Sequence, residues 1–391
     1  MSQEQVVNPG QAGLDPDVIE DAWLSLVRGA DRHEYGGAVA LIARRGRIAL
    51  HRATGWAVRE PEDQRSPMGE DTIFDLASLT KVVATTPSIL QLIHAGAFEL
   101  DTPARDLLPI FREENVSSEI TVRRLLSHSA GFISWLPVFL TATGPEAYLR
   151  AIAREPLAYP PGEQVIYSDP SFITLGEIVR EVSGMSVADY ACQHVFGPLG
   201  MRDTLFSPSV GHRLRIAATE FTNDFEANKV PDQRPAGGAW RSGLIRGEVH
   251  DGNAWYGLHG VAGHAGLFGT ALDLYRYGQM WLNGGVAGET RILPEDLVAE
   301  ATRVQIEHEG ERRGLGWRLA PSDGGAGDED SAKGLGPRAF GHTGFTGTSL
   351  WIDPDAEVVI VLLTNRVHPT VTTDYMKTRA SFMAAVMGAV R

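Results

Sequence analysis

Residues 74–81 read Phe-Asp-Leu-Ala-Ser-Leu-Thr-Lys, and they place Ser78 three positions before Lys81 at the start of an apolar helical run. Because residues at i and i+3 share one face of a helix, the hydroxyl of Ser78 and the ammonium of Lys81 are expected to meet within one turn. A serine hydroxyl becomes a strong nucleophile only when a base takes its proton, and a lysine is that base only where its surroundings keep it partly neutral. The stretch therefore predicts an activated nucleophile, provided that the chain also supplies burial, a second proton carrier and oxyanion donors.

The composition is that of a globular protein: of 391 residues, 43% are hydrophobic and 21% are charged. The formal charge of −14 argues against nucleic acid and against an anionic membrane surface as partners, because both require basic patches. Cys192 is the only cysteine, so we expect no disulfide and a buried thiol. The N-terminus lacks the features of a secretory signal, and no run approaches the ~20 apolar residues of a membrane span. We predict a cytoplasmic protein that acts on small molecules.

The order of the expected elements is helix, strands, a long helical middle, strands, helix. A helix should open at Asp15-Pro16 and run to about residue 32. Runs rich in β-forming residues predict strands at 37–43, 48–56, 339–343, 348–352 and 358–364, and we expect a final helix over about 373–389. An α+β fold accounts for this order: one antiparallel sheet is assembled from both ends of the chain and flanked by the terminal helices, with a mostly helical lobe inserted between its halves. We place the α/β lobe at about 1–75 plus 270–391, and the helical lobe at about 76–269.

The helix that carries Ser78 should continue to Ile93 and end near Gly96. Pro87 lies inside it, and because proline removes a helical hydrogen bond we expect either a kink there or a helix that packing forces to tolerate the proline. We expect a mobile surface loop at 321–337, where glycine, serine and acidic residues dominate, and further helices at 121–130, 145–154, 170–183, 187–195 and 272–283.

Tyr167, in a Tyr-Ser-Asp stretch that ends at Asp169, is the candidate second proton carrier. A tyrosine beside a serine–lysine pair exchanges a proton as phenol or phenolate, and such transfer contributes ~10²–10⁴ in rate. A third signal is the run from Gly341 to Ser349, which is rich in glycine at the start of the returning strands. Glycines there let a substrate approach the backbone, and a strand edge offers an N–H group to a developing oxyanion.

These three elements, in this order, resemble the serine β-lactamase and penicillin-binding-protein superfamily, in its class C-like branch with family VIII esterases and D-amino-acid peptidases. The resemblance spans about residues 36–386, so the chain is interpreted as one catalytic unit. Supporting stretches are 125–131, 198–201 and 263–268. Residues 247–254 are similar to a subgroup found beside bacterial cell-wall recycling genes.

The resemblance implies that Ser78 is the acylated nucleophile, Lys81 its proton acceptor and Tyr167 the second acid/base. It also implies that the backbone N–H groups of Ser78 and Phe345 form the oxyanion hole, and that substrate lies along the strand that carries His342, Thr343 and Gly344. No cofactor is implied. His342 stands where many β-lactamases have a lysine, so we expect a less cationic site and a weaker case for a β-lactam that carries a carboxylate.

Asp169 departs from the asparagine of most β-lactamases, and two interpretations stay open. An ionised aspartate only accepts hydrogen bonds, so it would bind an amide N–H or a substrate amine and repel a carboxylate. Alternatively, Asp169 and Pro170 form the N-cap and first residue of the helix at 170–183.

The histidines do not form a recognised metal-binding pattern. None lies in a His-Glu-x-x-His frame or beside a cysteine pair, so we predict no metal and assign structural hydrogen-bonding roles to His128, His250, His259 and His264. The chain has no G-x-S-x-G elbow, Walker loop or dinucleotide fingerprint.

The sequence therefore predicts a serine hydrolase that acts on an ester, amide or β-lactam through an acyl-enzyme, with carboxylesterase or β-lactamase-like activity. One alternative is an amidase or peptidase of peptidoglycan fragments or D-amino-acid peptides. The alternative from another class is a non-catalytic penicillin-binding sensor, since this scaffold also serves receptors. Neither the preferred substrate, the base for deacylation nor the oligomeric state follows from the sequence.

Overall fold

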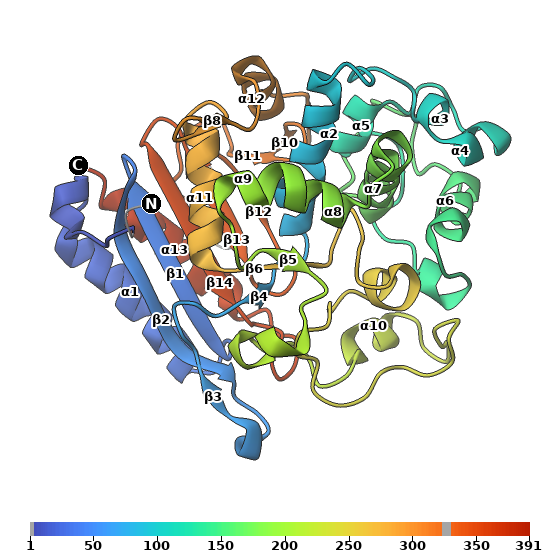
Figure 1. Cartoon of the computed structure of the whole chain (residues 1–391). Helices are drawn as coiled ribbons and strands as arrows, with labels where there is room; N and C mark the ends of the chain where they lie inside the picture. The colour runs from blue at the N-terminus through green and yellow to red at the C-terminus, as the bar shows by residue number, and fades with distance from the viewer. Residues whose placement is uncertain (1–3, 323–329) are drawn as a thin grey trace.

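The computed structural model describes residues 4–322 and 330–391, and a nine-stranded antiparallel sheet organises them (Figure 1). The strand order is β3-β2-β1-β14-β13-β12-β11-β10-β9. The strands are β1 (Gly37–Arg44), β2 (Arg47–Val58), β3 (Ser66–Pro67), β9 (Ile306–His308), β10 (Glu311–Arg313), β11 (Arg318–Leu319), β12 (Phe340–Thr343), β13 (Ser349–Asp353) and β14 (Val358–Thr364). All five predicted strands are confirmed, whereas β3, β9, β10 and β11 were not predicted.

The two ends of the chain meet at the centre of this sheet. β1 pairs with β2 through a hairpin whose two turn residues, Arg45 and Gly46, both have positive φ, as a two-residue hairpin turn requires. On its other edge β1 pairs with β14, with Ala40 opposite Leu362. Every residue of β1 is buried, because both faces of the sheet are covered. The predicted α+β fold, with one sheet built from both ends, is confirmed.

One face of the sheet is covered by the first and last helices, α1 (Pro16–Asp31) and α13 (Tyr375–Gly388) (Figure 1). The predicted start of α1 is confirmed, since the Asp15 side chain accepts a hydrogen bond from the N–H of Asp17 at 3.0 Å. Trp23 and Leu26 of α1 are buried in the core that α1 and α13 share with the sheet.

The opposite face is covered by α11 (Ala271–Leu282) and is continuous with the helical part of the molecule (Figure 1). Residues 76–269 add no strand to the large sheet; two short strands among them join β4 (Phe74–Asp75) in the order β4-β6-β5. The limits of the two lobes stay a prediction. The other elements are β5 (Leu205–Phe206), β6 (Leu267–Gly269), β7 (Val286–Ala287), β8 (Thr290–Arg291), α2 (Thr86–His94), α3 (Ala104–Leu107), α4 (Pro109–Glu113), α5 (Val122–Leu126), α6 (Pro145–Arg154), α7 (Asp169–Ser183), α8 (Val187–Ala191), α9 (Gly197–Leu199), α10 (Asp224–Lys229) and α12 (Glu295–Thr302).

Pro87 is accommodated by a widened turn rather than by an open kink. A π turn covers Lys81–Thr85, and the N–H of Thr86 donates to the carbonyl of Lys81. Pro87 then falls in the first turn of α2, where a helix does not need its N–H. The irregularity predicted at this proline is therefore present, and it begins at Lys81.

Two local predictions are wrong. Cys192 is exposed, because it lies on the outer side of a π turn at Cys192–Phe196 whose inner side buries Val195 and Phe196. The predicted mobile surface loop does not hold for Ala332 and Leu335, which are buried in the core against α13. Residues 323–329 of that loop lie outside the described residues.

Within residues 4–322 and 330–391, no helix combines the length and the apolar character needed to cross a membrane.

Candidate active site

Ser78 lies on a strained turn between β4 and the helix that follows. Ala77 has a φ of 47°, which costs a non-glycine residue on the order of 1–3 kcal/mol. The buried Asp75 holds this turn, because its Oδ1 accepts the N–H of Ala77 at 2.9 Å while its Oδ2 accepts the N–H of His250 at 2.7 Å. The turn leaves Ser78 only partly buried, at the mouth of two cavities.

Lys81 lies directly beneath Ser78 and is completely buried. Its Nζ donates to the Oγ of Ser78 at 3.1 Å, to Oδ1 of Asp169 at 2.8 Å and to the carbonyl of His264 at 3.1 Å. The contact between Ser78 and Lys81 that the spacing predicts is therefore present. The three partners use all three protons of an ammonium group.

The surroundings of Lys81 keep it charged. Burial alone would lower the pKa of its ammonium, but the neighbouring Asp169 carboxylate and the Tyr167 hydroxyl outweigh burial and raise it. Burial likewise raises the pKa of the Tyr167 phenol, against the opposing effect of Lys81. This arrangement therefore holds a protonated lysine beside a neutral tyrosine, and neither accepts the serine proton until the pair has lost a proton.

Tyr167 lies against the same lysine. Its hydroxyl is buried and has no hydrogen-bond partner of good geometry among the described residues, although Lys81 and Ser78 are near enough to lower its pKa. The Nζ of Lys81 is 4.8 Å from the centre of the tyrosine ring. The rings of His128 and His342 lie 4.7 and 5.7 Å away, centre to centre.

His128 positions the segment that carries Tyr167. Its Nδ1 accepts the N–H of Ser168 at 3.0 Å, and its carbonyl accepts the hydroxyl of Tyr159 at 3.0 Å. Burial, together with the positive charges of Arg313 and Lys81, holds the pKa of His128 well below its usual range. The predicted structural role of His128 is confirmed.

The helix-capping interpretation of Asp169 is wrong by one residue. The N-cap of α7 is Ser168, whose Oγ accepts the N–H of Ser171 at 3.2 Å. Asp169 is the first residue of α7, and its side chain pairs with Lys81 instead of capping the helix. The carboxylate lines the cavity beside Ser78, so its proposed contact with substrate stays a prediction.

Asp169→Asn is expected to shift the acidic limb of the pH profile of kcat/KM to lower pH by about 1 unit or more. A neighbouring carboxylate raises a lysine pKa by on the order of 1–3 units, and without it burial favours the neutral amine. Initial rates between pH 5 and 10 test this, with Asp17→Asn, an exposed first-turn aspartate of α1, as the matched control. If the acidic limb of the pH profile of kcat/KM does not move, Asp169 does not set the protonation state of Lys81.

The turn between β12 and β13 packs directly onto the turn that carries Ser78. A Cβ on Gly344 would lie 2.1 Å from Oγ1 of Thr348 and 2.5 Å from the carbonyl of Leu76, so only glycine permits this approach. Among the described residues, no hydrogen bond occupies the backbone N–H of Ser78 or of Phe345. Both residues line the same two cavities, which supports the oxyanion hole without testing it.

His342 and Thr343 lie in β12, where the strand borders one of these cavities. Nδ1 of His342 lies 2.8 Å from the carbonyl of Thr343, and its buried Nε2 has no partner among the described residues. Burial and the nearby Arg313 hold the pKa of His342 well below its usual range, so the imidazole is neutral.

The first cavity, which we call the arginine cavity, has a volume of about 370 Å³ and borders Ser78 and His342. Its lining includes Arg313, Arg318, Arg366 and Arg379. The expectation that His342 leaves the site poor in positive charge is therefore wrong, because arginines from other elements supply it. Arg313 and Arg318 are paired with Glu311 and Asp330. Arg366 and Arg379 form no ion pair with any described residue.

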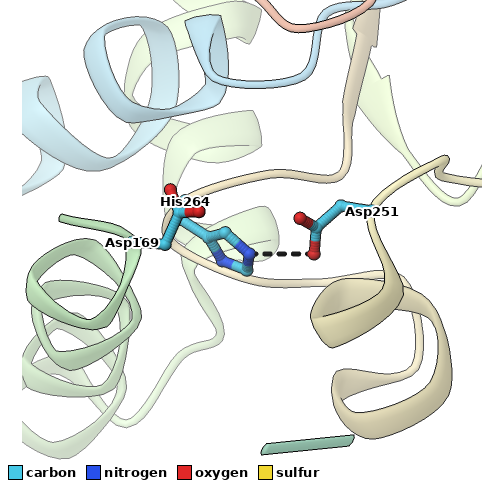
Figure 2. A group of neighbouring side chains, drawn as sticks. All are labelled: Asp169, Asp251 and His264. Atoms are coloured by element: carbon cyan, nitrogen blue, oxygen red, sulfur yellow. Dashed lines mark hydrogen bonds and ion pairs between the residues drawn. The ribbon is translucent and has the colours of Figure 1, made fainter. Parts of the chain in front are cut away.

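The second cavity, which we call the acidic cavity, has a volume of about 150 Å³ and is lined by Ser78, Asp169, Glu226, Asp251 and His264 among others. Figure 2 shows Asp251 and His264 facing each other beside Asp169, with Nε2 of His264 2.9 Å from Oδ1 of Asp251. One potential ligand atom from each of these three residues lies within 4.8 Å of the others, so they are the residues that could hold a metal ion. All three already have partners, because Asp169 pairs with Lys81 and Asp251 pairs with His264.

Of the other histidines that the sequence singled out, His250 lines this cavity. His250 pairs with the buried Glu220 at 2.8 Å, so hydrogen bonding is confirmed for His250 and His264. For His259 no hydrogen bond to another described residue is present, and the role predicted for it is wrong.

The sequence matches the family model described as Beta-lactamase over residues 24–382. The chain belongs to the beta-lactamase family. A relative from Salmonella enteritidis PT4, named "Putative D-alanyl-D-alanine carboxypeptidase", is 30% identical over 388 residues, which is 94% of this chain and 87% of the relative. As a member of this family the chain is a serine hydrolase, as the resemblance implied.

Solved structures share the beta-lactamase fold with this chain. A penicillin-binding protein homologue from Caulobacter crescentus matches with a TM-score of 0.71 and 21% identity, over 96% of this chain and 99% of that one. EstCE1, described as a hydrolase with promiscuous acyltransferase activity, matches with a TM-score of 0.69 and 22% identity, over 96% and 98% of the two chains. These likenesses confirm the fold.

Sequence reasoning missed the residues of this beta-lactamase-family site that come from distant loops and strands. The four arginines lie on β10, on β11, just after β14 and in α13, and no spacing connects them. Glu226, Asp251 and His264 lie in or between short elements. Asp251 and His264 fall in stretches that the resemblance used, 247–254 and 263–268, but a place in a charged cavity was predicted for neither, and no signal pointed to Glu226.

Proposed function

We propose that the chain hydrolyses short peptide-like amides whose leaving group carries a carboxylate, through an acyl-enzyme on Ser78. The arginine cavity carries this proposal, because it places guanidinium groups beside the nucleophile. Arg379 is buried, and its Nε has no partner among the described residues. A guanidinium without an anion is suited to a carboxylate, which it binds through two parallel hydrogen bonds.

The chemistry follows from the contacts of Lys81. After the Lys81–Tyr167 pair has lost a proton, it takes the proton of Ser78 as Oγ attacks the scissile carbonyl. The N–H groups of Ser78 and Phe345 stabilise the oxyanion, and one such donor is worth ~10²–10³ in rate. The pair then protonates the leaving amine, and water hydrolyses the acyl-enzyme.

The curated relative supports an amide substrate. A D-alanyl-D-alanine carboxypeptidase, as the Salmonella relative is named, releases a residue with a free carboxylate. We therefore place the peptidase or amidase alternative of the sequence analysis ahead of a simple carboxylesterase. Since β-lactams also carry a carboxylate, β-lactamase activity is the second candidate, and the same arginines favour it.

A substrate panel tests the proposal: D-alanyl-D-alanine, its C-terminal amide, nitrocefin and a short acyl ester. We expect steady-state turnover of D-alanyl-D-alanine, and a lower kcat/KM for the amide. Faster turnover of the uncharged ester than of any substrate with a carboxylate would contradict the proposal. A single burst without steady state would instead identify the penicillin-binding sensor.

Arg379→Met is expected to raise KM for the carboxylate substrate roughly 10- to 100-fold, which corresponds to one hydrogen-bonded charge contact. Rates with the C-terminal amide should change little, because the amide lacks the anion. Lys377→Met removes an exposed charge from the same helix and serves as the matched control. An equal loss with both substrates would mean that Arg379 supports the fold rather than the carboxylate.

A further inference from the structure

We infer that the acidic cavity binds a free ammonium group on the acyl half of the substrate, so that the preferred substrates are small zwitterionic peptides. This inference rests on the proposed function and names its substrate class. Ser78 borders both cavities. A carbonyl at Ser78 would therefore have acidic groups on its acyl side and arginines on its leaving-group side.

Three carboxylates, Asp169, Glu226 and Asp251, line the acidic cavity, and one of them lacks a direct cationic partner. Lys229 also lines the cavity, but its side chain is exposed and forms no ion pair with any described residue. Asp169 is paired with Lys81, and Asp251 with His264. Glu226 is buried and forms no ion pair with any described residue; it accepts only the N–H of Gly252 at 3.0 Å and the Nδ2 of Asn223 at 3.3 Å. A buried carboxylate without a cation is costly, so a ligand that brings one positive charge is favoured.

The pKa of Glu226 agrees with the absence of a direct cationic partner. Burial and the neighbouring Asp251 carboxylate raise the pKa of Glu226 to about 7, although Arg241 and His250 act in the opposite direction. His264 holds the pKa of Asp251 well below its usual range in spite of burial. An ammonium group close to Glu226 would favour its ionised form.

A second, independent feature marks the acidic cavity as a polar binding site. His264 is 1% exposed, and its Nδ1 has no hydrogen-bond partner among the described residues. The imidazole lines the same cavity as the carboxylates. Buried polar atoms are normally satisfied, so an orphaned ring nitrogen here points to a polar group that arrives with the ligand.

The size of the acidic cavity and the residues of its walls limit which ligands it can bind. Its volume of about 150 Å³ suits one small residue and leaves little room for a longer acylated chain. Trp135, Phe225 and Phe345 form aromatic walls, which attract cations. The exposed Lys229 lies over two of these rings, 5.1 Å from Trp135 and 4.5 Å from Phe225, so the ring faces already accept a cation.

A metal ion is the competing occupant, since Asp169, Asp251 and His264 are close enough to share one. The buried ammonium of Lys81 lies 2.8 Å from Asp169. A divalent ion at that carboxylate would face this positive charge at short range, and its doubled charge makes the repulsion larger than for a singly charged ammonium. The observations therefore favour the ammonium.

Matched substrates test the inference on the wild-type protein: D-alanyl-D-alanine against N-acetyl-D-alanyl-D-alanine. We expect kcat/KM to be about 10- to 100-fold higher for the free amine, from one lost charged contact. Glu226→Gln should reduce this ratio at least several-fold, with Asp224→Asn, an exposed carboxylate of the same helix α10, as the control. Asp251→Asn provides a second variant if Glu226→Gln does not fold.

Each other outcome is decisive. If both substrates are hydrolysed equally well, the ammonium site is wrong while the proposed function stands. If neither is hydrolysed but the ester or nitrocefin is, the proposed function fails and the inference falls with it. If EDTA abolishes activity and added Zn²⁺ restores it, the acidic cavity is a metal site and the inference is overturned.

Discussion

Ser78→Ala is expected to lower kcat by at least about 10⁴-fold on every substrate that the wild-type protein turns over, because no other group replaces a nucleophile in covalent catalysis. Intact-protein mass spectrometry after treatment with a serine-reactive phosphonate or a β-lactam gives the direct measurement. The wild-type protein should gain one adduct, located on the peptide that contains Ser78, and the variant should gain none.

The matched control is Ser209→Ala, which removes an exposed hydroxyl far along the chain and should label as the wild type does. Circular dichroism should show that both variants are folded, since Ser78 contributes one partly buried hydroxyl. Labelling of Ser78→Ala at another residue would remove Ser78 from the mechanism.

Lys81→Met is expected to cause a loss of about 10³-fold or more in acylation rate together with a loss of stability. The rate falls because the proton acceptor of Ser78 is gone. Stability falls because the carboxylate of Asp169, only 16% exposed, keeps its charge without its cation; breaking such a buried pair costs about 3–5 kcal/mol. Single-turnover labelling rates and thermal unfolding measure the two effects separately.

The double variant Lys81→Met with Asp169→Asn distinguishes catalysis from packing. Because Asp169→Asn removes the carboxylate that Lys81→Met leaves without a cation, the double variant should regain most of the melting temperature lost in Lys81→Met. The labelling rate should stay low. If the melting temperature and the labelling rate both return to the wild-type values, Lys81 serves only to neutralise Asp169.

The part of the fold set by local patterns could be predicted from the sequence. Runs rich in β-forming residues marked β1, β2 and β14, and the Asp15-Pro16 pair marked the start of α1. The i,i+3 spacing was enough to predict the contact between Ser78 and Lys81. The short edge strands β9, β10 and β11, of two or three residues each, are too brief to show a period.

The start of α7 shows how capping rules fail by one position. Ser168 and Asp169 are both good N-cap residues, and proline is accepted in the first turn after either of them. Only tertiary structure decides between them, since Lys81 takes the carboxylate and leaves Ser168 to cap. The charges of the two cavities were unpredictable for the same reason: they depend on which loops meet, not on spacing along the chain.

The pairing of β1 with β14 has a consequence for how the molecule is made. Ala38 lies opposite Thr364, so one edge of the fully buried strand β1 has no partner until more than 300 further residues have been made. Contacts of such long sequence separation form slowly, and an unpaired apolar strand is prone to aggregate. The sheet beneath Ser78 can therefore be completed only once β14 has been made, and a chain truncated before β14 would lack the strand that joins β1 to β13.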